Sequence, residues 1–104
     1  GPAEISGPLR DAKQQPASGL QAVLIPARYR NLPELSPPTT TDRDGHFTFR
    51  AVPPGDYKVF AWEAIEAFSY FDEAVIRQYE GLGQSVHVEE SSKPSIIVKV
   101  IASR

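Results

Sequence analysis

Cysteine and methionine are absent from this chain of 104 residues, and it contains only two histidines and one tryptophan. The absence of cysteine excludes a disulfide framework, a thiolate nucleophile and a cysteine-bound zinc site. A chain of this length can bury roughly two thirds of the surface that its unfolded form exposes. The hydrophobic core is therefore expected to hold the fold together without a covalent or metal staple.

The chain also lacks an excess of one charge and any long hydrophobic run. It carries 11 basic and 13 acidic residues, so no basic stripe can neutralise a phosphate backbone and nucleic acid is not an expected partner. The longest apolar runs, residues 22–25 and 96–98, fall far short of the roughly 20 residues of a membrane helix. The Gly1-Pro2 start is typical of a cleaved expression tag, so we expect any natural signal peptide or preceding domain to have been removed.

Proline and glycine are plentiful, with ten and seven residues, and they separate short β-rich runs. This punctuation is typical of an all-β sandwich and not of a helical bundle. We predict one domain over residues 1–104, an Ig-like or transthyretin-like β-sandwich of seven strands with one short helix. The predicted strands cover residues 3–9, 20–26, 39–42, 46–50, 56–63, 84–89 and 94–101. Pro8 predicts that the first of them lies at a sheet edge, because proline cannot donate to a ladder.

The segment 39–62 gives the strongest local signals. Asp44-Gly45 predicts a hairpin, because glycine tolerates the positive φ that a primed turn requires. In the strand after this turn Phe47 and Phe49 share one face, as the period of two demands, so we expect both in the core. A second turn at residues 53–55 leads into the next strand, which carries large apolar groups on both faces.

A short helix over residues 71–80 is predicted to cover the second face of that strand. Ser69 and Asp72 have the spacing of a helix start, and Gly81 and Gly83 are expected to end the helix in left-handed conformations. The predicted apolar stripe consists of Phe71, Val75 and Tyr79, with Ile76 beside it, and it is expected to lie over Phe60 and Trp62.

The central motif of the chain resembles the signature of carboxypeptidase regulatory-like domains. Its residues are Thr41-Asp42, Gly45, Phe47, Phe49, Val52-Pro53, Pro54-Gly55, Tyr57 and Val59. The aromatic strand at Ala61-Trp62-Glu63, the helix after it, Gly83 and the closing Val98-Lys99-Val100 are similar to a bacterial subgroup. The resemblance implies a transthyretin-like, or prealbumin-like, sandwich that serves as a non-catalytic accessory module outside the cytoplasm. Pro8 departs from the pattern, because the family favours a β-former there.

Candidate catalytic and metal-binding residues are few. His46 and His87 lie far apart in the sequence, so we interpret them as surface or hydrogen-bonded histidines. The chain lacks the closely spaced His-x-His of intradiol dioxygenases and the Tyr-Arg-Gly-Ser end of hydroxyisourate hydrolases, two enzyme classes with transthyretin-like architecture. Asp42, Asp44 and Gly45 lack the later ligands of a calcium loop, so turn formation explains them better. We therefore predict no enzyme activity, no catalytic residue, no metal site and no cofactor.

Aromatic residues in and near loops give the remaining candidates for a binding site. Sugar rings stack on exposed aromatic rings, so Tyr29, Phe68 and Tyr70 are predicted as a ligand-binding set. Trp62 and Phe71 are instead expected to be buried between helix and sheet. The favoured hypothesis is a structural or interaction module of a larger extracytoplasmic bacterial protein, with other proteins or other domains of its parent chain as partners. It would present the loops 27–38 and 63–70. The alternative is a carbohydrate-binding module.

Overall fold

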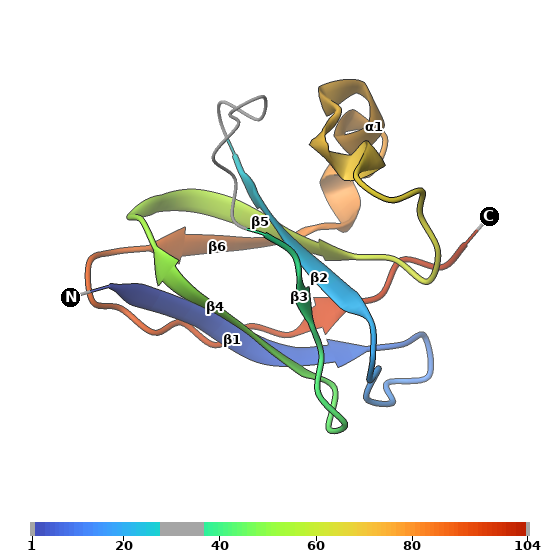
Figure 1. Ribbon diagram of the computed structural model, residues 1–104, viewed down its shortest axis with the longest axis horizontal. Helices are drawn as coiled ribbons and strands as arrows, with labels where there is room; N and C mark the ends of the chain where they lie inside the picture. The colour runs from blue at the N-terminus through green and yellow to red at the C-terminus, as the bar shows by residue number, and fades with distance from the viewer. Residues whose placement is uncertain (1, 28–36, 104) are drawn as a thin grey trace.

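Two β-sheets face each other in the computed structural model, which describes residues 2–27 and 37–103 (Figure 1). One sheet has the strand order β4-β1-β7 and the other the order β3-β2-β5-β6. The strands are β1 (Ala3–Arg10), β2 (Gln21–Pro26), β3 (Thr39–Thr40), β4 (His46–Val52), β5 (Gly55–Ala61), β6 (Gln84–Val88) and β7 (Val98–Lys99). The predicted all-β sandwich is thus confirmed. No helix of the described residues is long and apolar enough to cross a bilayer.

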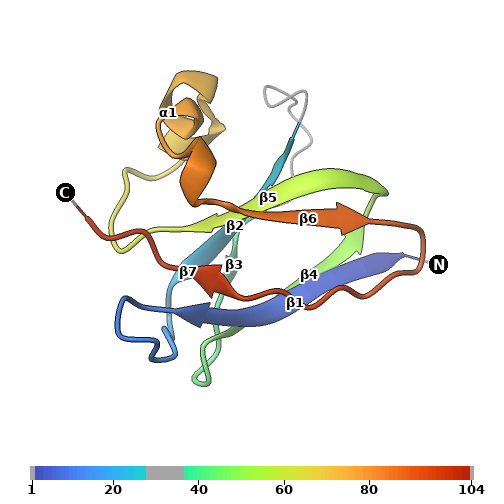
Figure 2. The ribbon, with the colours of Figure 1, turned by 180° about the vertical axis from the view of Figure 1, so that it is seen from behind.

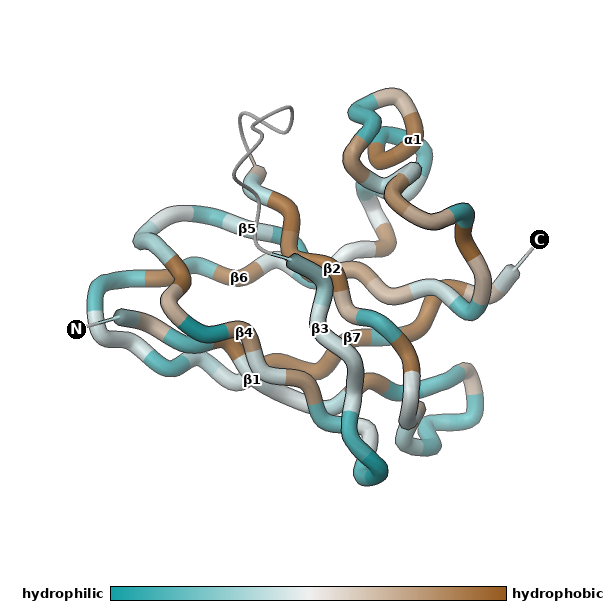
Figure 3. Tube along the Cα trace, in the orientation of Figure 1, coloured by the Kyte–Doolittle hydropathy of each residue, from teal (hydrophilic) through white to brown (hydrophobic). Residues whose placement is uncertain are grey.

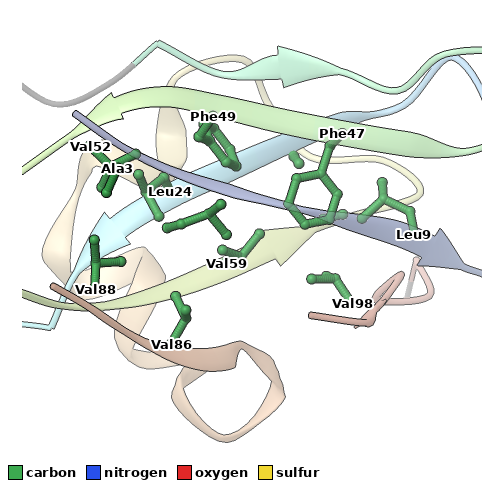
Figure 4. Packing of buried hydrophobic residues seen from close by; sticks show 13 residues of the cluster. Ala3, Leu9, Leu24, Phe47, Phe49, Val52, Val59, Val86, Val88 and Val98 are labelled. Atoms are coloured by element: carbon green, nitrogen blue, oxygen red, sulfur yellow. The ribbon is translucent and has the colours of Figure 1, made fainter. Parts of the chain in front are cut away.

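The main core lies between the two sheets and follows the predicted alternation. Phe47 and Phe49 on β4 point inward with their rings 5.7 Å apart, and both are at least 96% buried. Leu24 on β2 and Val59 on β5 meet them from the opposite sheet (Figure 4). Hydrophobic residues follow β2 for most of its length (Figure 3), because both faces of this strand are covered.

The Asp44-Gly45 turn forms, but the predicted hairpin is wrong. The turn is closed by bonds from the Gly45 amide to the Asp42 carbonyl and from the Asp42 amide to the His46 carbonyl, each 3.0 Å long. Its flanking strands then separate, since β3 pairs with β2 in one sheet and β4 pairs with β1 in the other. The chain therefore crosses from sheet to sheet at this turn, which local turn chemistry alone does not distinguish from a hairpin.

The prediction that the first strand lies at a sheet edge is also wrong, because β1 lies between β4 and the C-terminal segment. The amides of Glu4 and Ser6 donate to the carbonyls of Ser92 and Pro94. The period of two makes Pro8 the next residue on that side, and it has no N–H to donate. Pairing with the C-terminal segment resumes at Leu9 opposite Val98. The strand thus tolerates Pro8 at an interior position through one gap in its ladder.

The last predicted strand is shorter than expected, since β7 covers only two residues of the range 94–101. The side chains of this range nevertheless alternate between the core and solvent, as in a strand. Val98 is fully buried, Ile96 and Val100 pack against the main core, and Ile97 between them is 53% exposed.

A second hydrophobic cluster covers the outer face of the β3-β2-β5-β6 sheet, as predicted for Phe60 and Trp62. The covering segment lies on the far side of this sheet from β1 and β4 (Figures 1 and 2). The predicted short helix is confirmed as α1 (Glu73–Arg77), which is shorter than the expected range 71–80 and is flanked by two 3-10 turns (Ser69–Phe71 and Glu80–Leu82). Asp72, and not Ser69, caps α1: its carboxylate accepts from the Ala74 amide at 2.8 Å.

The residues that α1 buries differ from the predicted stripe. Ile76 is 1% exposed, whereas Val75 is only half-buried. The helix starts at Glu73, directly after the Asp72 cap, and it turns Ile76 toward the sheet. The predicted left-handed stops are wrong as well, since neither Gly81 nor Gly83 has a positive φ. Gly83 is needed for space instead, because a Cβ there would lie 2.6 Å from the Phe60 ring.

Candidate binding site

The loop between β5 and α1 presents an aromatic residue in an unusual backbone conformation. Phe68 has φ 66° and ψ −1°, a left-handed geometry that residues other than glycine rarely adopt. The Ser69 amide and hydroxyl both donate to the Glu66 carbonyl, at 3.1 and 2.7 Å, and the Phe71 amide donates to the Phe68 carbonyl at 3.1 Å. These bonds hold Phe68 in a conformation that costs energy, a feature that clusters at ligand-binding sites.

The Phe68 side chain is the most exposed large hydrophobic group among the described residues, at 67%. Its ring is stacked on that of Phe71, with centroids 6.3 Å apart and planes 20° from parallel, and it lies 6.5 Å from Tyr70. One side of the ring is therefore supported by the protein while the rest faces solvent. We call the rings of Phe68 and Phe71 the aromatic surface.

Tyr70 lies beneath this surface and does not present its own ring. It is 3% exposed and stacks on Trp62 at 5.9 Å, and Trp62 in turn stacks on Phe60 at 5.5 Å. The expected burial of Trp62 is confirmed, and Phe71 is half-buried against the same cluster. Of the predicted ligand-binding set, Phe68 reaches the surface and Tyr70 supports it, while Tyr29 lies outside the described residues, as does most of the loop 27–38.

An open pocket of about 240 Å³ is lined in part by Tyr70, whose ring contacts both rings of the aromatic surface. Its polar groups come from Gln21 at the start of β2 and Glu63 just after β5, so no sequence motif could signal it. Glu63 accepts bonds from the Ser103 amide and hydroxyl at 2.8 and 3.3 Å, and the indole Nε1 of Trp62 is buried without a hydrogen-bond partner among the described residues. The pocket is lined by Gly19, Leu20, Gln21, Val23, Trp62, Glu63, Ala64, Ile65 and Tyr70.

A second shallow pocket, of about 280 Å³, lies on the outer face of β5 and β6. There His87 pairs with Asp56 on the neighbouring strand, Nδ1 to Oδ1 at 2.7 Å, and its Nε2 lies 3.8 Å from Glu89. Lys58 is occupied by the carbonyl and carboxylate of Glu80, at 2.7 and 3.0 Å. The interpretation of His87 as a hydrogen-bonded surface residue is confirmed.

The hydrogen bond and charge of Asp56 raise the pKa of His87 above its ordinary value, which is about 6.5. Because the folded pKa is the higher one, the pair stabilises the fold fully below the unfolded pKa, and this contribution is lost as pH rises through the folded pKa. We expect Asp56→Asn to lower the His87 pKa, measured by NMR titration of the imidazole protons. The His46 resonance serves as the internal control, and an unchanged His87 titration would show that the pair does not form.

The predicted interpretation of Asp42 as a turn residue agrees with its contacts. Its carboxylate accepts from the amides of His46 and Asp44, at 3.0 and 2.8 Å, and these bonds, led by that from His46, lower the pKa of Asp42. Within residues 2–27 and 37–103, no group of three or more histidine or acidic side chains is placed to hold a metal ion.

Comparison with known proteins gives similarity at the level of the fold. No protein-family model matches the chain, and no curated protein matches it by sequence. Among solved structures it is similar to the major pilin subunit of Bacillus cereus (14% identity, TM-score 0.63, 95% of this chain and 28% of the pilin). It is also similar to a streptococcal ancillary pilin (15%, 0.62, covering 93% and 31%) and to a proposed carbohydrate-binding protein from Pseudomonas aeruginosa (20%, 0.60, covering 95% and 88%).

The chain spans less than a third of either pilin but most of the Pseudomonas protein. At identities of 20% or less, these matches establish an Ig-like sandwich, and residue roles do not transfer between such proteins.

Proposed function

We propose that this chain is a non-catalytic interaction module of a larger extracytoplasmic bacterial protein, and that it binds its partner through the aromatic surface. The observation that carries the proposal is Phe68: a strained backbone holds a phenylalanine ring 67% exposed to solvent. An exposed aromatic anchor on a rigid support is typical of the energetic centre of an interface. The partner is another protein or another domain of the parent chain.

Two further observations support this role and location. The solved structures that share the fold include two pilins, and their names describe components of a protein assembly. The central sequence motif resembles carboxypeptidase regulatory-like domains, whose members are accessory modules outside the cytoplasm. The Asp42 carboxylate and the His87 imidazole are occupied by turn and cross-strand contacts, and so fit structural roles.

Carbohydrate binding is the second candidate, and the open pocket favours it. Phe68 offers a ring face for stacking, and the nearby pocket offers the Glu63 carboxylate and the Gln21 amide as polar partners for sugar hydroxyls. The Pseudomonas protein with the same fold is described as a proposed carbohydrate-binding protein. In this candidate the Trp62 and Tyr70 rings do not stack on sugar, because they cover each other.

Photo-crosslinking in the intact parent protein tests the first candidate. With a photoreactive phenylalanine in place of Phe68, we expect a discrete crosslink to a single partner in the native cell. The matched control carries the photoreactive phenylalanine in place of Ile97. Ile97 is also exposed, at 53%, but it lies in the C-terminal segment. The proposal fails if both positions give the same products or if neither gives any.

A glycan array separates the two candidates. Saturable binding to a glycan by the wild-type chain, abolished by Phe68→Ala and kept by Ile97→Ala, would replace the first candidate with the second. We expect Phe68→Ala to change the free energy of unfolding by no more than about 0.5 kcal/mol, because the ring is largely exposed. Lost binding in this variant therefore reports on the surface and not on unfolding.

A further inference from the structure

The first strand and the last segment of the chain are parallel neighbours. The amides of Glu4 and Ser6 donate to the carbonyls of Ser92 and Pro94, at 3.0 and 3.1 Å, and the Ile96 amide returns a bond to Ser6 at 2.9 Å. Beyond Pro8, Leu9 and Arg10 pair in parallel with Val98 and Lys99, and the Val100 amide donates to the Arg10 carbonyl at 2.9 Å. The two segments are thus joined along the whole length of β1.

The C-terminal segment is then attached to the opposite sheet. Its Ile101 amide donates to the Ala61 carbonyl at 2.8 Å, and the Glu63 amide donates to the Ile101 carbonyl at 2.9 Å. At the last described residue, the Ser103 amide donates to the Glu63 carboxylate at 2.8 Å. Residues 92–103 therefore bridge the two sheets, and we call them the bridging segment.

The two ends of the described chain leave the sandwich at opposite ends (Figure 2). β1 and the bridging segment run in the same direction. A force that draws the two ends of the chain apart therefore acts along both segments, and it pulls β1 in one direction and the bridging segment in the opposite direction. Such a force loads the hydrogen bonds between them together. A force across two strands instead opens their bonds one after another, and each alone is worth only about 1 kcal/mol.

From this geometry we propose that the module bears tensile load along its chain, with β1 and the bridging segment as a non-covalent shear clamp. The clamp is packed closely at its middle, where Gly7 lets the carbonyl of Ile96 approach the β1 backbone. This function goes beyond the interaction role of the aromatic surface and does not depend on what Phe68 binds.

Single-molecule force spectroscopy tests the proposal by changing only the direction of pulling. The chain has no cysteine, so paired cysteines can be placed at exposed sites as unambiguous handles. Pro2→Cys with Ala102→Cys loads the clamp in shear, whereas Pro2→Cys with Lys93→Cys pulls apart two neighbouring points at one end of it. Forced unfolding follows the unfolding rate, and we expect a mean rupture force about two-fold or more higher in the first geometry at equal loading rate. Equal forces, or a higher force in the second geometry, would overturn the proposal.

A pair of proline variants locates the resistance. Ser6→Pro removes the donor to Pro94 on the outward side of β1 without touching the core. Thr48 on β4 lies opposite Ser6. The backbone N–H and C=O of Ser6 bond to the bridging segment, so Ser6 and Thr48 form a non-hydrogen-bonded pair. The backbone N–H and C=O of Thr48 therefore point away from β1. Thr48→Pro is therefore the matched control. We expect Ser6→Pro to lower the shear rupture force and Thr48→Pro to leave it closer to wild type; equal losses would place the resistance elsewhere.

Discussion

Gly7→Ala is expected to lower the free energy of unfolding by about 3 kcal/mol or more. Gly7 has φ +156°, a conformation that an L-residue rarely adopts. A Cβ there would overlap the carbonyl oxygen of Ile96 and lie 2.8 Å from its carbonyl carbon. Both neighbours are backbone atoms, so the contact cannot be relieved by a side-chain rotation, and β1 and the bridging segment would have to separate.

Urea denaturation followed by the fluorescence of the single tryptophan measures this loss. Gly81→Ala is the control, because an added Cβ there meets no heavy atom within 4 Å and its φ is not positive. We expect this control to be neutral, or to stabilise the protein by up to about 1 kcal/mol. A loss below about 1 kcal/mol for Gly7→Ala would contradict the close approach of the two segments.

Phe60→Ala is expected to cost about 3–5 kcal/mol, the range typical of a fully buried phenylalanine. The ring is 1% exposed, stacks on Trp62 with centroids 5.5 Å apart, and fills the space that Gly83 leaves open. Its loss would leave a cavity between the sheet and the segment that contains α1. We therefore expect the Trp62 emission to shift to longer wavelength as well, since water gains access to the indole.

The matched control for Phe60→Ala is Phe68→Ala, the same substitution eight positions along the chain at an exposed ring. Stability should then differ between the two variants by at least about 2 kcal/mol, measured in the same urea titration. If both substitutions cost the same, the second cluster does not contribute to the fold as its burial indicates.

The strands of this protein could be predicted from the sequence because their apolar residues alternate with a period of two. The alternation is enough to place Phe47 and Phe49 in the core. It also shows that Phe60 and Trp62 require a covering element. Strand pairing could not be predicted in the same way. The partner of β1 along one side comes from the far end of the chain, and turns such as Asp44-Gly45 form equally well within one sheet and between two.

For the helical segment and the candidate site, too, the sequence predicts some features and not others. A helix near residues 71–80 is evident from the sequence, but the pattern places its start at Ser69, three residues before the cap that forms at Asp72, and it does not show that Ile76 is buried more deeply than Val75. The exposure of Phe68 followed from its place in a loop. Its left-handed backbone and the pocket between Gln21 and Glu63 arise from tertiary contacts between segments that no local pattern connects.

The position of the bridging segment has a consequence for how the protein comes to fold. β1 acquires its second neighbour only from residues 92–100, so the contacts that complete its sheet span nearly the whole chain. Long-range pairing of this kind slows folding and leaves unpaired strand edges exposed until it is complete. As the polypeptide is synthesised, β1 must wait for residues 92–100 to emerge. We expect the sandwich to close only after these residues have left the ribosome, with the β2–β5–β6 sheet and its aromatic cover forming first.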